Sequence, residues 1–285
     1  MKSLKDAIIL LRFPFSFFLL PIFLFGTYLG SAPFSRDYFL AFFLLHFLVY
    51  PASNGYNSHE DKDEEAIGGI EKPPPPNRLL FFVCLFFDLI AVVLAFSIGL
   101  TFGVLILLYI LFSRAYSSRL IRLKKRAILS YFIIAFFQGV NILWLAYSVS
   151  GGELSFTNRP LILSSIFAFL LLGGSYPITQ IYQHKSDAKD GIISLSARLG
   201  VSKTLLFSEI HVAAAIIALY LLLPLLHFSL FILFMLPVLV YMQWWKRACK
   251  KDHAAASFKN TMRMNILASI CLNAAFLTLI ILKHA

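Results

Sequence analysis

The stretch Asn57-Ser58-His59-Glu60-Asp61-Lys62-Asp63-Glu64-Glu65 lies between two long apolar segments of a 285-residue chain. Five of the chain's 14 acidic residues fall within the last six positions of this stretch. Such crowding of negative charge is costly unless cations bind there. If the stretch is helical, Asn57, Asp61 and Glu65 recur at a four-residue step and share one face. The sequence therefore predicts a row of oxygen ligands for a metal ion.

The composition around this stretch is that of an integral membrane protein. Apolar residues make up 59% of the chain and charged residues 14%, with a mean hydropathy of +0.80, whereas a soluble domain carries about 25% charged residues. We predict an all-α, multi-pass transmembrane helical bundle that forms a single domain over residues 1–285. Its nine candidate spans approach the ~20 residues that cross a bilayer core and cover residues 11–30, 37–53, 79–98, 100–113, 127–149, 160–178, 204–225, 228–245 and 264–282.

Basic residues indicate the orientation of these spans. With the N-terminus in the cytoplasm, 22 of the 25 Lys and Arg residues lie on the inner side, and only Arg36, Arg159 and Lys283 lie outside. This bias favours nine spans with the acidic stretch facing the cytoplasm, in a bacterial-type cytoplasmic membrane by default. The net charge of +11 is explained by basic loops that face anionic lipid. No nucleic-acid-binding pattern is present.

Two further cytoplasmic loops carry polar residues of complementary kinds. Gln183 and Asp187 are four residues apart, so a helix that leaves the sixth span would present both on one face. Mg²⁺ bound by few carboxylates keeps coordination positions for substrate phosphates, which points to a phosphorylated lipid as substrate. The loop from Arg114 to Arg126 supplies six cations in 13 residues. These cations either set the topology and bind lipid headgroups, or they clamp a diphosphate.

Three motifs on these loops are similar to those of a known family. Asn57-xxx-Asp61-xxx-Glu65 resembles the NxxxDxxxD first motif of the UbiA superfamily of intramembrane prenyltransferases. The segment 187–200, Asp-xxx-Gly-xx-Ser-Leu-Ser-Ala-Arg-Leu-Gly, resembles the end of the second motif, DxxxDxxxGxxTLxxRLG. Tyr116-Ser117 followed by Arg122-Leu123-Lys124 is similar to the YS…RLK loop of some members. The motifs stand in family order, so the resemblance covers nearly the whole chain.

The resemblance implies a helical bundle whose central cavity opens to the cytoplasmic side and toward lipid. In that family, Mg²⁺ held by the two acidic motifs binds the diphosphate of a polyprenyl donor and helps it to leave. The resulting allylic cation is attacked by a lipophilic acceptor, aromatic or similarly electron-rich, while Lys or Arg takes up developing charge. By position, Asp61 and Asp187 would be the catalytic carboxylates. The implied metal ligands are Asn57, Asp61, Glu65, Gln183 and Asp187, and the implied diphosphate contacts are Lys72, Arg122 and Lys124.

Two positions depart from the family pattern. Glu65 replaces Asp with a longer carboxylate that can still bind a metal. Gln183 replaces Asp with an amide, whose oxygen coordinates Mg²⁺ but brings no charge, so a second ion would be held less tightly. This second departure leaves open a non-catalytic member that binds isoprenoid lipids through a degenerate second metal motif.

Polar residues inside the predicted spans are costly in lipid and face either a cavity or another helix. Asp88 most needs a partner, and it is the main support for a third alternative, a secondary transporter. Gln138 and Asn141 are candidates to line an acceptor site. His46 and His211 are further polar residues inside the predicted spans. The three cysteines have no pairing or ligand spacing and are interpreted as small apolar residues: Cys84, Cys249 and Cys271.

Overall fold

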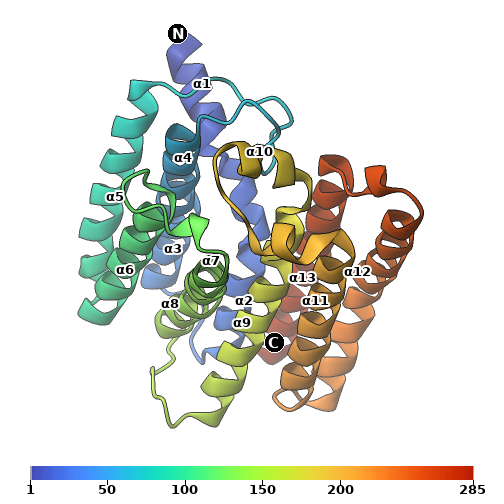
Figure 1. Ribbon diagram of the computed structural model, residues 1–285. Coiled ribbons are helices and arrows are strands. Elements are labelled where there is room, and N and C mark those ends of the chain that lie inside the picture. The colour runs from blue at the N-terminus through green and yellow to red at the C-terminus, as the bar shows by residue number, and fades with distance from the viewer. Residues whose placement is uncertain (1, 285) are drawn as a thin grey trace. The chain divides into compact units, whose positions relative to one another are not determined.

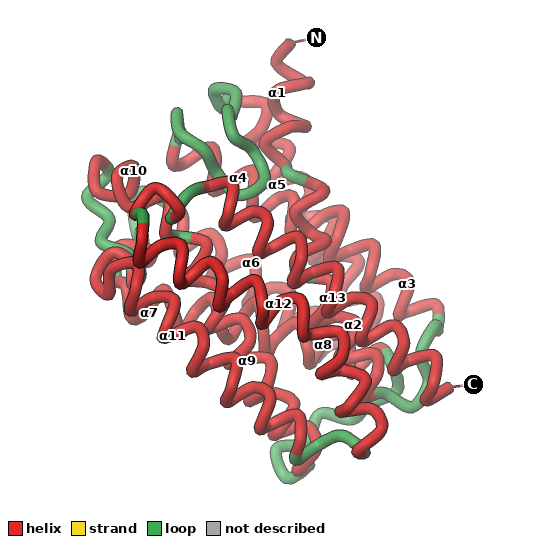
Figure 2. The backbone as a smooth tube through the Cα atoms, turned by 90° about the vertical axis from the view of Figure 1, so that its right-hand side faces the viewer, coloured by secondary structure: helices red, strands yellow, loops and turns green. Residues whose placement is uncertain are grey.

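The computed structural model describes residues 2–284, and nearly all of its regular structure is helical (Figures 1 and 2). Within these residues the only β-type pairing is an isolated bridge between Ile67 and Ile70. Eight helices are long and apolar enough to cross a membrane, and the broken pair Ser3–Phe18 with Leu20–Leu29 provides a ninth candidate. The predicted all-α, multi-pass transmembrane bundle is therefore confirmed.

The chain divides into two compact units. The first unit comprises Met1–Phe17 and Phe34–Lys125, and the second comprises Phe18–Pro33 and Arg126–Ala285. Each acidic motif lies in a different unit, the first motif in the first unit and the second motif in the second. That both units belong to a single domain stays a prediction.

The helices of the first unit carry the first motif on a continuous span. This span runs from Arg36 to Asp61 and consists of α3 (Arg36–Phe43), the π-helical turn η2 (Leu44–Val49) and α4 (Tyr50–Asp61). The wide π-turn lies directly before Pro51, which lacks an N–H and whose ring crowds the carbonyl four residues earlier. The other elements are α1 (Lys2–Leu11), η1 (Phe13–Phe18), which reaches the boundary of the unit, α5 (Arg78–Ile98), α6 (Leu100–Ser117) and η3 (Leu123–Lys125).

Small side chains let α4 approach its neighbours in the first unit closely. A Cβ added to Gly55 would lie 2.8 Å from the Cys84 sulfur of α5, so a larger residue here would force neighbouring side chains to shift. The buried core around it joins α1, α4 and α5 and contains Ala7, Leu10, Leu11, Ala52, Ile67, Leu80 and Cys84. All three cysteines are unpaired and buried, which confirms their interpretation as small apolar residues.

A buried ion pair joins three helices of the first unit. Asp88 of α5 accepts a hydrogen bond of 2.7 Å from Nε of Arg114 on α6, and a second one from the same guanidinium. Arg114 also donates to the carbonyl of Ala52 on α4 at 3.1 Å, and its guanidinium lies 4.3 Å from the ring centroid of Tyr56. Asp88 is thus engaged in helix packing, which removes the main polar feature that favoured a transporter.

Helix α6 continues to Ser117, four residues beyond the predicted end of the fourth span at residue 113. Arg114, which the sequence predicts in a loop, therefore lies inside the helix, where Asp88 neutralises its charge and the Ala52 carbonyl accepts a hydrogen bond from it. Residue 99 makes the tight connection between α5 and α6 that the sequence predicts.

The second unit is built around clustered aromatic rings. The ring centroids of Phe25 and Phe167 are 4.8 Å apart, those of Phe25 and Phe276 are 4.9 Å apart, and Phe231 packs against both Phe167 and Phe276. The helices of this unit are α2 (Leu20–Leu29), α7 (Ala127–Ile134), η4 (Ala135–Asn141), α8 (Ile142–Val149), α9 (Arg159–Thr179), η5 (Ile181–Gln183), α10 (His184–Lys189), α11 (Leu195–Tyr220), α12 (Leu225–Lys251), η6 (His253–Ala255) and α13 (Phe258–His284).

Polar residues within the helices of the second unit mostly serve helix packing. Nε2 of His211 on α11 hydrogen-bonds the hydroxyl of Tyr131 on α7 at 2.7 Å, and its Nδ1 donates to the carbonyl of Phe207 at 2.9 Å. Asn141 is fully buried in the π-turn η4. Contact of Gln138 or Asn141 with an acceptor stays a prediction.

Candidate functional site

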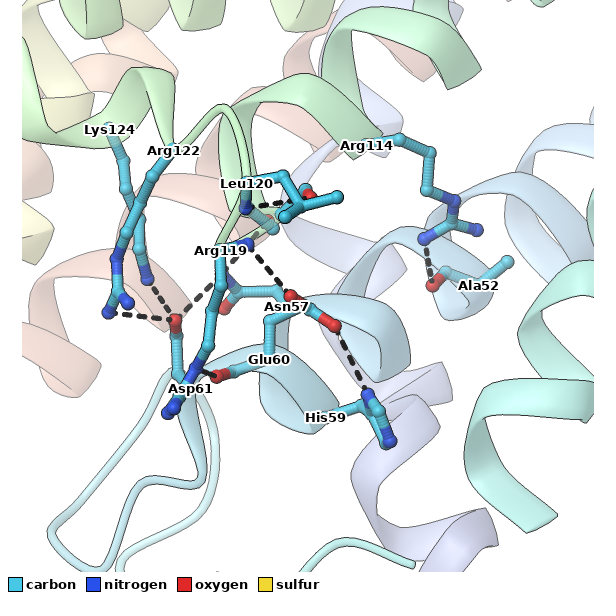
Figure 3. A network of polar contacts seen from close by, with 12 residues as sticks. Ala52, Asn57, His59, Glu60, Asp61, Arg114, Arg119, Leu120, Arg122 and Lys124 are labelled. Carbon is cyan, nitrogen blue, oxygen red and sulfur yellow. Dashed lines mark hydrogen bonds and ion pairs between the residues drawn. The ribbon is translucent and has the colours of Figure 1, made fainter. Parts of the chain in front are cut away.

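The last turn of α4 presents two residues of the first motif on one face. Nδ2 of Asn57 donates to Oδ2 of Asp61 at 2.9 Å, as the four-residue step predicts (Figure 3). The same nitrogen donates to Oγ of Ser117 on α6 at 3.1 Å. Because an ionised carboxylate only accepts hydrogen bonds, the amide nitrogen must face Asp61. Both of these hydrogen bonds use the nitrogen, which leaves Oδ1 of Asn57 as a ligand atom.

Two cations of the basic loop lie against the Asp61 carboxylate. Nζ of Lys124 pairs directly with Oδ1 of Asp61, and the Arg122 guanidinium lies 3.8 Å from the same oxygen (Figure 3). The side chains of Asp61 and Lys124 are each 8% exposed and that of Arg122 is 12% exposed. Two of the three predicted diphosphate contacts are therefore assembled beside the first motif.

A tight turn after α6 brings these cations back to α4. The carbonyl of Ser118 accepts from the backbone N–H of Ile121 at 3.2 Å and of Arg122 at 2.7 Å. Arg122 itself has a φ of +48°, in the left-handed region, which costs a residue with a side chain roughly 1–2 kcal/mol. Strained backbone of this kind concentrates at functional sites. Here it accompanies a side chain that is directed at Asp61.

The predicted common face of Asn57, Asp61 and Glu65 is wrong at Glu65. Helix α4 ends at Asp61, where Lys62 adopts a left-handed conformation with φ of 55°. Continuing the helix would add acidic residues at its negative end and would bring Glu64 beside Glu60 and Glu65 beside Asp61, and both effects oppose helix formation. Glu65 instead lies exposed on a bend beyond the helix, and its role as a metal ligand stays a prediction.

Lys72 lies apart from this cation pair. It is exposed in the extended segment before the four prolines 73–76, and it forms no hydrogen bond or ion pair with any residue that the structure describes. Contact of Lys72 with a diphosphate therefore stays a prediction.

In the second unit, the second motif lies on a short helix of its own. Helix α9 ends at Thr179, two residues after Pro177, and the chain continues through the 3-10 turn η5 into α10. Gln183 ends η5 and Asp187 lies in the first turn of α10, so both lie on the helical segment Arg159–Lys189 that continues the sixth span. That the two side chains share one face stays a prediction. The metal-binding roles of Gln183 and Asp187 stay predictions.

The first residue of this polar loop, Gln180, has no role assigned from the sequence. Gln180 is 8% exposed, and its Nε2 donates to the Tyr176 hydroxyl at 2.8 Å. Its Oε1 is buried and has no hydrogen-bond partner among the described residues. A buried carbonyl oxygen of this kind is costly without a partner. Its position three residues before Gln183 is the only signal that the sequence offers for it.

The oxygen atoms at the end of α4 are suited to Mg²⁺ that is bound together with a phosphate. Within residues 2–284 no three His, Cys, Asp or Glu side chains converge as a metal site. Asp61 and Asn57 supply one carboxylate and one amide oxygen, both hard ligands. Mg²⁺ is typically bound by one or two carboxylates with substrate phosphates completing its coordination. The residues fit that mode of binding.

Solved structures of other proteins share this fold. A UbiA homologue from Archaeoglobus fulgidus bound to DMAPP and Mg²⁺ aligns with a TM-score of 0.71 at 17% identity, over 96% of this chain and 99% of that one. The Archaeoglobus fulgidus structure with GPP and Mg²⁺ gives a TM-score of 0.67 at the same identity and coverage. A structure of digeranylgeranylglyceryl phosphate synthase gives 0.61 at 17% identity, over 99% and 98% of the two chains. The comparison with curated proteins gives no match.

The chain is thus an all-helical membrane bundle with an Asn and Asp pair beside a basic turn. The sequence profile of the UbiA prenyltransferase family matches residues 18–267. The chain therefore belongs to the UbiA prenyltransferase family, which confirms the resemblance drawn from its three motifs.

Proposed function

We propose that this protein transfers a prenyl group from a polyprenyl diphosphate to a lipophilic acceptor in the membrane, with Mg²⁺ as cofactor. The observation that carries the proposal is the convergence of Lys124, Arg122 and Asn57 on Asp61 at the end of a membrane helix. Family membership and the homologues bound to DMAPP or GPP with Mg²⁺ support it. We also propose that the acceptor is aromatic and that the site faces the cytoplasm.

The first motif and the basic turn have different proposed roles, which follow from their charges. Asp61 and Asn57 would hold Mg²⁺, which when bound supplies a Lewis acid for the diphosphate leaving group. In the absence of substrate, Lys124 and Arg122 neutralise Asp61. Both cations lie within reach of any diphosphate bound beside Asp61, and Arg can contact two phosphate oxygens at once. Negative charge that develops on the departing diphosphate is thereby met by preorganised cations.

The second motif enters the proposal through Asp187. A single carboxylate with the Gln183 amide binds a cation more weakly than two carboxylates would. The same substitution supports the alternative function, a non-catalytic member that binds isoprenoid lipids. A member of that kind would bind a prenyl lipid but release no diphosphate.

The Gln183→Asp variant tests how the second motif has diverged. We expect it to lower the Mg²⁺ concentration needed for half-maximal activity about tenfold, because it restores a charged oxygen ligand. The measurement is a Mg²⁺ titration of prenyl transfer for wild-type protein and variant. Loss of activity in the variant would show instead that Gln183 serves a different purpose.

A transfer assay tests the proposed function itself. The protein in lipid nanodiscs is incubated with radiolabelled geranyl, farnesyl or longer prenyl diphosphates and a lipid extract as acceptor source, with Mg²⁺ or with EDTA. We expect Mg²⁺-dependent release of pyrophosphate and transfer of label to a lipid product. Binding of the prenyl diphosphate without any release of pyrophosphate would favour the non-catalytic alternative.

A further inference from the structure

The basic turn is fastened to α4 at a second point, one residue before Asp61. The Glu60 carboxylate accepts a hydrogen bond from the backbone N–H of Arg119 at 2.8 Å (Figure 3). Nε of Arg119 also donates to the backbone carbonyl of Glu60 at 2.7 Å. Arg119 thus donates two hydrogen bonds to Glu60 across 59 positions of sequence, and we name this pair the Glu60–Arg119 clamp.

The physical chemistry of the clamp favours a fixed geometry. The carbonyl of Glu60 is one of the last four of α4, which have no partner inside the helix. A guanidinium at this end also interacts favourably with the helix dipole. The Glu60 side chain is only 15% exposed, with Nδ1 of His59 at 3.3 Å from its other oxygen. Both hydrogen bonds of the clamp include a charged group and are therefore of the stronger kind.

The clamp determines where the next five residues lie. Arg119 is the second residue of the turn whose Ser118 carbonyl accepts from Arg122, and the backbone N–H of Lys125 then bonds to the Arg122 carbonyl at 3.0 Å. The turn is thus internally bonded between its anchor on Glu60 and the ion pairs of Arg122 and Lys124 with Asp61. Asp61 alone would not hold the turn once a diphosphate competes for its cations.

We propose that Glu60 and Arg119 are positioning residues that keep Arg122 and Lys124 beside the first motif when these cations exchange Asp61 for a substrate diphosphate. The inference rests on the proposed role of the two cations in diphosphate binding. Position 60 falls on an unspecified position of the NxxxD pattern, and neither clamp residue is needed as a ligand itself. The clamp acts through the backbone of the turn.

A spin label on the turn tests whether the clamp fixes it. Leu120 is 97% exposed, so a label on Leu120→Cys reports the motion of the backbone, and the buried Cys84, Cys249 and Cys271 do not compete for it. We expect Glu60→Ala to mobilise the label in its electron paramagnetic resonance spectrum. Glu60→Gln keeps an acceptor oxygen and should preserve most of the restriction. Glu64→Ala, which removes an exposed acid nearby, is the matched control and should leave the spectrum unchanged.

Substrate affinity provides the second measurement. We expect Glu60→Ala to weaken Mg²⁺-dependent binding of geranyl diphosphate on the order of tenfold, as is typical when the positioning partner of a ligand is removed. Glu60→Gln should recover most of this loss and Glu64→Ala should show none. An immobile label in Glu60→Ala, or a mobile label with unchanged affinity, would overturn the inference. If the wild-type protein binds no prenyl diphosphate, the proposed function fails, and the spin label alone decides whether the clamp exists.

Discussion

Replacing Asp61 by Asn is expected to lower prenyl transfer at least about a hundredfold while the protein stays folded, since even partners outside the ligand shell of a metal change affinity or activity about 10- to 100-fold. The substitution keeps the shape of the side chain but removes a carboxylate that contacts both Asn57 and Lys124. A neutral amide holds Mg²⁺ weakly and no longer balances the two cations. The measurement is prenyl transfer at saturating donor.

The control for this variant is Glu64→Gln, which removes one negative charge from an exposed residue three positions further along. It should retain wild-type activity. Thermal unfolding in detergent separates loss of chemistry from loss of fold, because Asp61 lies at the end of α4 and outside the aliphatic core of the first unit. Asp187→Asn is expected to behave like Asp61→Asn. Normal turnover in both Asp variants would refute the proposed site.

A large effect on stability is expected at Asp88. Asp88→Leu leaves the Arg114 guanidinium buried without its carboxylate, and breaking a buried ion pair from one side typically costs about 3–5 kcal/mol. We expect the unfolding free energy in mixed detergent micelles to fall by an amount of this order. Three helices meet at this pair, so the loss should be cooperative.

The double variant Asp88→Leu with Arg114→Leu distinguishes an ion pair from a site of chemistry. Replacing both charges with apolar groups typically recovers most of the stability that a single replacement removes. We therefore expect the double variant to unfold closer to wild type than Asp88→Leu does, and to keep measurable Mg²⁺-dependent prenyl diphosphate binding. A double variant less stable than Asp88→Leu would contradict the structural role of this pair.

The sequence predicted what depends on local pattern. Apolar runs of spanning length gave the bundle, and the four-residue step correctly placed Asn57 and Asp61 on one face. Diphosphate binding was one of two roles predicted for the basic loop, and the structure brings Arg122 and Lys124 of this loop to the first motif. In each case neighbouring residues in the chain, or a strong charge preference, determine the outcome.

What the sequence could not predict depends on competition between local effects or on packing. At Glu65 the helical period competed with repulsion between acidic side chains four residues apart, and the helix ended first. The partner of Asp88 is 26 positions away, and α5 and α6 must first pack before the two side chains can meet. The Glu60–Arg119 clamp depends on a backbone N–H, which no side-chain pattern reveals.

The most direct test of a metal-dependent prenyl diphosphate site is a binding titration of farnesyl diphosphate to the protein in lipid nanodiscs. It compares wild type and Asp61→Asn, each with Mg²⁺ and with EDTA. We predict saturable binding by wild type that requires Mg²⁺ and is lost in Asp61→Asn. Binding that is equally tight with EDTA, or unchanged in Asp61→Asn, would contradict a metal site at the end of α4.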